Sequence, residues 1–297
     1  MTGTPAAPAN VTGRTPGPPT SFVPLDAVPV RRYGQWCTAA VAVVLLASLA
    51  FALADNENID YATIAEYFSS AAILKGLLTT FQMSIIGMVA GILIGVLIAV
   101  ARMSDNAVLR SMAGGYIWLF RGVPLLVQIL VWGNFALLFP RLGVGIPFTD
   151  TLFFSVDTNT VITTFVAACL GLSLHEGAYM AEIVRGGILG IDSGQREAAT
   201  ALGMSGPLAM RRVVLPQALR IIIPPTGNQF ISLLKASSLV AIIAGHDLMS
   251  TAQNIAAQNY RTIEMLLVAS LWYLLIVSVL NVLQRMLEQR LGRSVNR

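Results

Sequence analysis

The sequence predicts an all-α integral membrane protein, a polytopic bundle of about six spanning helices. Two observations of composition carry this prediction: 55% of the 297 residues are hydrophobic, and only 11% are charged. Because a soluble domain has about 25% charged residues, fifteen acidic and nineteen basic side chains cannot cover the surface of a soluble protein of this length. The apolar residues also come in long runs. These features argue against a soluble enzyme, a nucleic-acid-binding protein and a disordered protein.

The N-terminal segment, residues 1–35, is expected to be a disordered, Pro-rich cytoplasmic tail. Its first thirty residues hold seven of the fourteen prolines, and such a segment has too little apolar surface to offset the entropy lost on ordering. An apolar run, residues 36–54, follows Arg31 and Arg32. This run could be a cleaved signal peptide, but its length of 19 residues favours a retained transmembrane span.

Five further runs approach the ~20 residues that a helix needs to cross a bilayer. They are residues 73–101, 122–139, 161–184, 221–245 and 264–287. The connections set the orientation, because cytoplasmic loops carry an excess of Lys and Arg. Residues 55–66 hold four acids and no base, whereas residues 185–220 hold five arginines and the C-terminal tail adds four. Six spans with both termini in the cytoplasm satisfy every loop.

Two of these runs contain residues that are unusual in a spanning helix. Gly87, Gly91 and Gly95 recur at every fourth position, which predicts a smooth helix face for close packing. The run 221–245 contains two prolines and several polar side chains, so we expect a kinked helix that faces protein or a water-filled path. The packing and hinge positions expected in the spans are Gly87, Gly91, Gly95, Pro124, Pro224 and Pro225.

The catalytic signatures in the sequence are incomplete. His175 and Glu176 begin a zinc-protease motif, but Tyr179 stands where the second His is needed. Ser173 and His175 lie about 200° apart around a helix and cannot form a nucleophile–base pair; a pairing of Ser173 with His246 stays a minor alternative. The phosphate-binding loop requires Gly-Lys-Ser/Thr, whereas both lysines follow leucine. We therefore expect no catalytic residue, metal or bound cofactor, and any ATP and Mg²⁺ would be used by a separate subunit.

The most informative stretch is the arginine-rich loop between the fourth and fifth predicted spans. It reads Glu197-Ala198-Ala199, three residues, Gly203, nine residues, Val213, one residue, then Leu215-Pro216. Asp192 can cap a short helix, with Gln195 three residues later, and Gly203 can end it in the left-handed conformation. A second short helix would begin at Ser205 and end at Pro216. The loop should thus form two short helices, joined at an angle, on the cytoplasmic face.

This spacing resembles that of the integral-membrane subunits of ABC importers. The family pattern is Glu-Ala-Ala, three residues, Gly, nine residues, Ile, one residue, Leu-Pro, and this chain departs from it only at Val213. Residues 121–128 resemble the Arg-Gly-Thr-Pro-Leu-Leu-Val-Gln run of permeases for polar amino acids of the histidine, glutamine and arginine type, with Val123 in place of Thr. Also similar to that subfamily are residues 177–179, 182, 185–188, 194–195, 215–218, 235 and 237–239.

The resemblance covers residues 71–290 and implies a five-span permease domain there, with the span 36–54 added before it. It implies a multi-pass subunit of the bacterial plasma (inner) membrane that belongs to an ATP-driven importer and is not itself an enzyme. An external solute-binding protein would deliver a polar amino acid, and two ATPase subunits and a second permease, identical or related, would complete the complex. An ion-driven secondary carrier for a small polar solute is the alternative, but it does not explain the spacing from Glu197 to Pro216.

The resemblance also implies where the functional residues lie. The cytoplasmic loop would couple the spans to the ATPase through Glu197, Ala198, Ala199, Gly203, Leu215 and Pro216. A polar amino acid needs polar partners in a low-dielectric setting, so the candidates for the substrate path are Gln128, His175, Glu176, Glu182, Lys235, Ser237 and Ser238. Glu182 and Arg185 are spaced to pair on one helix face. For Lys235, an ion pair, a cytoplasmic gate and direct substrate contact all stay open.

Overall fold

The computed structural model describes residues 33–145 and 152–292, and the chain divides into two units, Met1–Asn56 and Glu57–Arg297. The described part of the first unit contains helix α1 (Tyr33–Ala54), which is long and apolar enough to cross a membrane. Its side chains from Gly34 to Ala54 are exposed. The predicted span 36–54 is therefore helical along its whole length, whereas most of the predicted tail lies outside the described residues.

The second unit is a bundle in which α8 (Thr164–Leu189) is the central helix. Four helices contact it: α3 (Ala71–Arg102), α4 (Ala107–Gly122), α5 (Leu125–Gly133) and α11 (Leu215–Ala236). Helix α13 (Thr262–Gly292) packs against α11, and also against α2 (Tyr61–Phe68) and α12 (Leu248–Asn259). The prediction of a polytopic all-α bundle is thus confirmed for the described residues.

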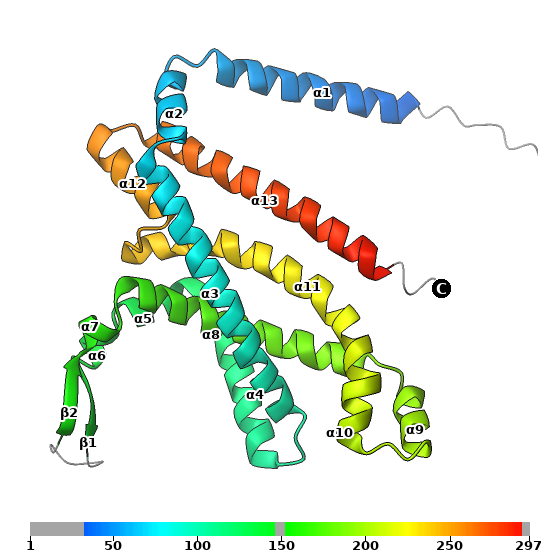
Figure 1. Ribbon diagram of the computed structural model, residues 1–297. Helices are drawn as coiled ribbons and strands as arrows, with labels where there is room; N and C mark the ends of the chain where they lie inside the picture. Colours follow the sequence, from blue (N-terminus) through cyan, green and yellow to red (C-terminus); the bar gives the residue numbers. More distant parts are fainter. Residues whose placement is uncertain (1–32, 146–151, 293–297) are drawn as a thin grey trace, which may run out of the picture. The chain divides into compact units, whose positions relative to one another are not determined.

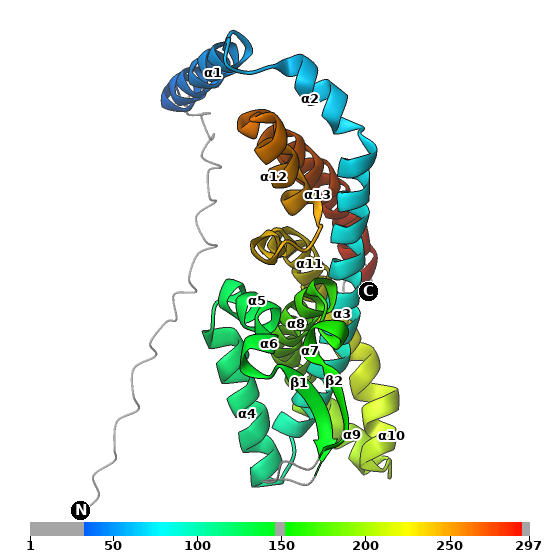
Figure 2. The same ribbon diagram turned by 90° about the vertical axis from the view of Figure 1, so that its left-hand side faces the viewer.

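Short elements lie at the two ends of this bundle (Figures 1 and 2). One end holds α6 (Phe135–Leu138), an antiparallel pair β1 (Arg141–Gly145) and β2 (Leu152–Asp157), and α7 (Thr158–Val161). The other end holds α9 (Ser193–Ala201), α10 (Gly206–Ala209) and the π-helical turn η1 (Met210–Val214). A 3₁₀ segment, η2 (Ser237–Ile243), follows α11. The two strands were not anticipated for the connection at residues 140–160.

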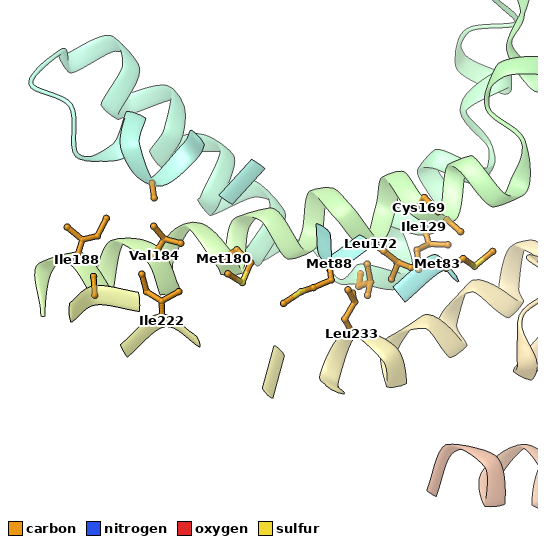
Figure 3. Close-up of a cluster of buried hydrophobic side chains, with 14 of the residues drawn as sticks. Met83, Met88, Ile129, Cys169, Leu172, Met180, Val184, Ile188, Ile222 and Leu233 are labelled. Atoms are coloured by element: carbon orange, nitrogen blue, oxygen red, sulfur yellow. The ribbon is translucent and has the colours of Figure 1, made fainter. Parts of the chain in front are cut away.

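The glycine face of α3 brings that helix close to α8. A Cβ atom added at Gly87 would lie 3.1 Å from Leu172 Cβ, and one at Gly91 would lie 2.8 Å from Glu176 Cβ. A cluster of buried apolar side chains also joins α3, α8 and α11. Figure 3 shows Met88, Leu172 and Leu233, one from each of these helices, meeting within it. Because lipid tails are as apolar as the helices, close backbone approach and dispersion contacts are what hold such helices together.

The number of spanning helices agrees with the prediction only when broken helices are counted. Among the described residues, α1, α3 and α13 are each long and apolar enough to cross a membrane, and two bent pairs of helices raise the number to five. Helix α8 has 26 residues and is long enough as well, although its polar side chains keep it out of that set. With α8 counted by its length, the number is six.

The predicted span 122–139 is not one helix, and the expected hinge position Pro124 lies at a break. Instead α4 and α5 meet at an angle of 98°, and Asn134 separates α5 from α6. The break follows from Pro124, which lacks an N–H group and pushes the residue before it out of the helical conformation. Val123 is accordingly extended, with a ψ angle of 131°.

Packing along the glycine face predicts a marked difference between two Gly→Ala substitutions. A Cβ at Gly95 would lie 2.9 Å from the backbone N of Ala181 on α8, whereas a Cβ at Gly115 on α4 would have no neighbour within 4 Å. We expect Gly95→Ala to lower the free energy of unfolding by about 1–3 kcal/mol. Gly115→Ala should stabilise the protein by up to about 1 kcal/mol, because alanine favours helices. Thermal unfolding in detergent measures both, and equal midpoints would contradict the packing described.

Candidate functional site

The side chain of Gln128 pairs with the backbone carbonyls that are left free at the break between α4 and α5. Pro124 cannot donate a hydrogen bond to the carbonyl of Phe120, four residues earlier. The Gln128 side chain replaces it, since Nε2 donates to Phe120 O at 2.9 Å and to Val123 O at 2.8 Å. Unpaired carbonyls inside a membrane protein are costly, and Gln128 is only 6% exposed. Its contacts are therefore those of a side chain that satisfies the broken helix.

Next to Gln128 lies a row of polar and aromatic side chains on α8. Gln128 Nε2 is 3.2 Å from His175 Nδ1, and the His175 ring lies 5.0 Å from that of Tyr179. The guanidinium of Arg121, at the end of α4, stands 5.1 Å from the centre of the Tyr179 ring, within the range of a cation–π interaction. Arg121 and Tyr179 were not among the predicted path residues. Their signal was present in the sequence, since both fall in stretches that resemble the permease subfamily.

Glu176 points to a different side of α8 from His175, because consecutive residues are about 100° apart on a helix. It is 1% exposed and lies against Gly91 of α3. Its Oε2 accepts a hydrogen bond from Gln229 Nε2 of α11 at 3.4 Å, and no donor among the described residues reaches its Oε1. Glu176 thus sits where α3, α8 and α11 meet, inside the bundle.

Glu182 and Arg185 form the ion pair that their spacing predicted. Arg185 Nη2 lies 2.7 Å from Glu182 Oε2, and Arg185 Nε donates to the same oxygen at 3.1 Å. Both side chains are about one third exposed, so they remain accessible from one side of α8. Together with His175 and Tyr179 they form a partly exposed polar line along this helix.

Helix α11 has an exposed stripe that is unusual for a helix in a membrane. Positions at intervals of three or four residues are exposed along its length, and we call them the α11 stripe: Ile221, Pro225, Asn228, Ser232 and Lys235. Placing polar and charged side chains in contact with lipid costs free energy. The stripe must therefore face water or another protein chain. Ser237 is fully buried and Ser238 half-buried, and their hydroxyls donate to Leu234 O and Lys235 O within the helix.

Polar side chains of α13 contact α11 beside its two internal prolines. Pro224 and Pro225 remain within a continuous helix, although each removes one backbone hydrogen bond. Gln284 Nε2 of α13 donates to Pro224 O at 2.8 Å, and the same amide donates to Glu288 Oε1 at 2.8 Å. Asn228 Nδ2 lies 3.4 Å from that carboxylate oxygen. Helices α11 and α13 are thereby joined by a polar chain.

The loop with the Glu-Ala-Ala spacing forms α9 as predicted. Asp192 Oδ1 accepts from Gly194 N at 2.7 Å and caps the helix, and Gly203 ends it with a φ angle of +74°. Glu197 and Ala198 are exposed, whereas Ala199 is 3% exposed and packs inward. Gln195 does not complete a capping box here; its Oε1 accepts from Gln217 Nε2 at 3.4 Å.

The predicted end of the second short helix at Pro216 is wrong. Helix α10 continues through the π turn η1 directly into α11, and Pro216 stands in the first turn of α11. A proline is tolerated in a first turn because its missing N–H leaves little unpaired there, and the wider π turn absorbs the change of register before it. Leu215 and Pro216 therefore begin the long helix, exposed beside the loop.

Two contacts fix α9 to the bundle. Arg196 Nη2 donates to Ile188 O in the last turn of α8 at 2.5 Å, and Gln195 contacts Gln217 of α11. A force applied to α9 would thus reach both α8 and α11. At the opposite end of the bundle Arg261 lies 3.7 Å from Asp60 Oδ2 and 3.5 Å from Glu264 Oε1. The Thr63 hydroxyl, which donates to Asp60, holds the pKa of that carboxyl below its usual value.

Comparisons with known proteins agree with this geometry. Residues 91–293 match the family model described as binding-protein-dependent transport system inner membrane component. The arginine transport system permease protein ArgU of Corynebacterium glutamicum is 41% identical, over 92% of this chain and 85% of that protein. The probable amino-acid ABC transporter permease protein YckA of Bacillus subtilis is 38% identical, over 75% of this chain and 90% of that protein.

A solved structure is similar as well. It is described as the crystal structure of an amino acid ABC transporter with histidines, with a TM-score of 0.67 and 33% identity. The match covers 78% of this chain and 99% of that chain. The match to ArgU leaves only 8% of this chain outside it, so it must extend into α1.

The contacts of Gln128 predict that it stabilises the fold. Gln128→Leu leaves the carbonyls of Phe120 and Val123 without their donor, which should cost about 1–3 kcal/mol for each unpaired group. Gln82→Leu on α3 is the matched control, because Gln82 is exposed. Thermal unfolding in detergent should show a lower midpoint for Gln128→Leu and little change for Gln82→Leu. A Gln128→Leu variant as stable as the wild type would contradict this role.

Proposed function

The chain belongs to the family of binding-protein-dependent transport system inner membrane components, and on this premise we propose how it takes part in transport. It is the membrane-spanning permease of an ABC importer, and a separate subunit hydrolyses the ATP. This family membership favours an ATP-driven importer over an ion-driven secondary carrier. We assign it a polar amino acid as substrate. The names of the relatives support this choice, since one is an arginine transport permease and another an amino-acid permease.

The complex that this function requires contains an ATPase and a solute-binding protein. We propose two ATPase subunits and a second permease, identical or related, with the binding protein on the outer face. The arginine-rich end of the bundle, with α9 and α10, then lies in the cytoplasm, and the end with β1, β2 and α12 lies outside. The distribution of charge supports this orientation, which also puts both termini in the cytoplasm.

Helix α9 is the proposed docking element for the ATPase. Glu197 and Ala198 are exposed on it, and Gly203 has open space around it, so a partner surface can approach closely. Because Arg196 binds the end of α8 and Gln195 contacts α11, α9 can pass the motion of the ATPase to two spanning helices at once. The spans would then move as a rigid body between two states.

The α11 stripe is the single observation that carries the proposed path. Asn228, Ser232 and Lys235 are exposed on a spanning helix, so we propose that this stripe lines the route of the amino acid between the two permease subunits. The partly exposed line of His175, Tyr179 and Glu182 on α8 is a second candidate lining. Gln128, Glu176 and Ser237 are buried and bonded within the chain, and we assign them to structure.

Docking at α9 predicts that a bulky side chain at Gly203 uncouples ATP hydrolysis from uptake. A Cβ there meets no atom of this chain within 4 Å, so Gly203→Ala adds mainly the strain of a positive φ angle, about 1–2 kcal/mol. Gly203→Leu adds bulk that should obstruct the partner. Gly206→Leu, also in open space, is the control for bulk alone. Proteoliposomes with the ATPase and binding protein would measure hydrolysis and uptake.

We expect Gly203→Leu to insert normally and to abolish most uptake while ATP hydrolysis persists or falls independently of substrate. Gly203→Ala and Gly206→Leu should retain most uptake. Normal coupling in Gly203→Leu would rule out close docking at the end of α9.

A path along the α11 stripe predicts which introduced cysteines react with a charged, membrane-impermeant thiosulfonate. In a background that carries Cys37→Ser and Cys169→Ser, Ser232→Cys should react, because it would face water. Ser270→Cys on α13 is the matched control, since its exposed neighbours Leu271 and Leu274 are apolar. Mass spectrometry of membrane vesicles measures modification. A Ser232→Cys variant that reacts only in trace amounts, as expected of a thiol against lipid, would refute the proposed path.

A further inference from the structure

Three arginines line one pocket at the α9 end of the bundle. The pocket has a volume of about 570 Å³ and is lined by Arg102, Arg185 and Arg196. Its other lining residues are apolar. Arg185 is paired with Glu182. Arg102 Nη1 donates to a backbone carbonyl, Arg110 O, at 3.3 Å. Arg196 likewise binds a carbonyl, and its Nε is buried without any partner among the described residues. Within the described part of the chain, no acidic side chain is paired with Arg102 or Arg196.

An apolar groove adjoins this arginine pocket. The groove has a volume of about 780 Å³ and runs along α3, α8 and α11. Met103, Ile188 and Met210 line both spaces, so the arginine pocket lies beside the groove. Asp105 also lines the groove, but it does not line the arginine pocket. A cationic pocket thus lies next to a mostly apolar groove.

The groove lies on a different side of α11 from the α11 stripe. The groove residues on α11 include Leu215, Leu219 and Ile222, and at 100° per residue they are centred about 140° from the stripe. The α11 stripe is proposed to line the transport path between two permease subunits. The groove then faces away from that path and from the second permease. Val96 and Val100 on its α3 side are 41% and 59% exposed, as expected for side chains that contact lipid.

We propose that the arginine pocket and the groove together bind one anionic phospholipid. The phosphate of the headgroup pairs with Arg102 and Arg196, and an acyl chain lies in the groove along α3 and α11. Guanidinium groups bind phosphate through charge-assisted hydrogen bonds, and anionic lipids attract arginines at the cytoplasmic surface of a membrane. The location at the end of α3 and α8 places this lipid directly beside α9.

The position of Arg196 gives this site a consequence for coupling. Arg196 precedes Glu197 on α9 and holds that helix to Ile188 of α8. A phosphate bound by the guanidinium of Arg196 would fix the same side chain from a second direction. The anionic lipid thus strengthens the attachment of α9 to the bundle, and the proposed role of α9 in transport does not need to hold for the lipid to bind.

Native mass spectrometry of the purified transporter complex tests the site. The complex is incubated with equal amounts of phosphatidylglycerol and phosphatidylcholine in mixed micelles, and bound lipids are counted. We expect selective retention of phosphatidylglycerol, reduced about fivefold by Arg102→Gln, since one arginine near a lipid surface is worth about that factor. Leu219→Trp fills the groove without changing charge and should also reduce retention. Arg285→Gln on α13, an exposed arginine outside the pocket, should have no effect.

Three results would overturn the proposal. Equal retention of both lipids by the wild type, or unchanged retention in Arg102→Gln and Leu219→Trp, would exclude a selective lipid site. Displacement of phosphatidylglycerol by inorganic phosphate alone would assign the pocket to a free anion. Loss of the ATPase from the Arg102→Gln complex with lipid retention unchanged would assign the arginines to acidic residues of the ATPase. Reduced retention in a monodisperse, fully assembled complex would support the lipid.

Discussion

The close packing of α3 on α8 is the contact on which the other features of the bundle depend. No hydrophobic force draws helices together in a membrane, so small residues that allow backbone approach are decisive. Gly87, Gly91 and Gly95 provide this approach. With α8 fixed against α3, Glu176 at this contact also binds Gln229 of α11. Elsewhere on α8, His175 contacts Gln128, and the carbonyl of Ile188 accepts a hydrogen bond from Arg196 of α9.

A second constraint explains the polar side chains that are buried in the spans. Each break or proline in a spanning helix leaves a backbone carbonyl without its usual partner, and lipid cannot supply one. Gln128 serves this purpose at Pro124, because it donates to the carbonyl of Phe120 four residues earlier. Broken helices are therefore compatible with a membrane protein here because a neighbouring side chain replaces the missing N–H group. The polar residues that remain exposed, above all the α11 stripe, are then the ones left for transport.

Much of the fold was predictable, because its signals are local. Run lengths and glycine spacing predicted the long helices and the α3 face, and i,i+3 spacing predicted the pair of Glu182 and Arg185. The positive φ angle of Gly203 followed from helix-end chemistry. Pro124 was predicted as a packing or hinge position, but the bounds of the span around it were wrong, since hydropathy does not register a bend beside an apolar run. Whether Gln128 or Glu176 faces a transport path or the bundle interior depends on which helices pack beside it. The sequence of one apolar segment does not contain that information.

Whether α9, α8 and α11 move together decides if ATP-driven motion can reach the path. A pulsed electron paramagnetic resonance measurement on the reconstituted complex tests this directly, with spin labels at Ser193 of α9 and Ser232 of α11 in a background without native cysteines. Labelled chain is diluted with unlabelled permease so that each complex carries one labelled copy. The distance between the labels should stay the same with and without an ATP analogue that traps the closed ATPase. A shift of α9 relative to α11 would contradict rigid coupling.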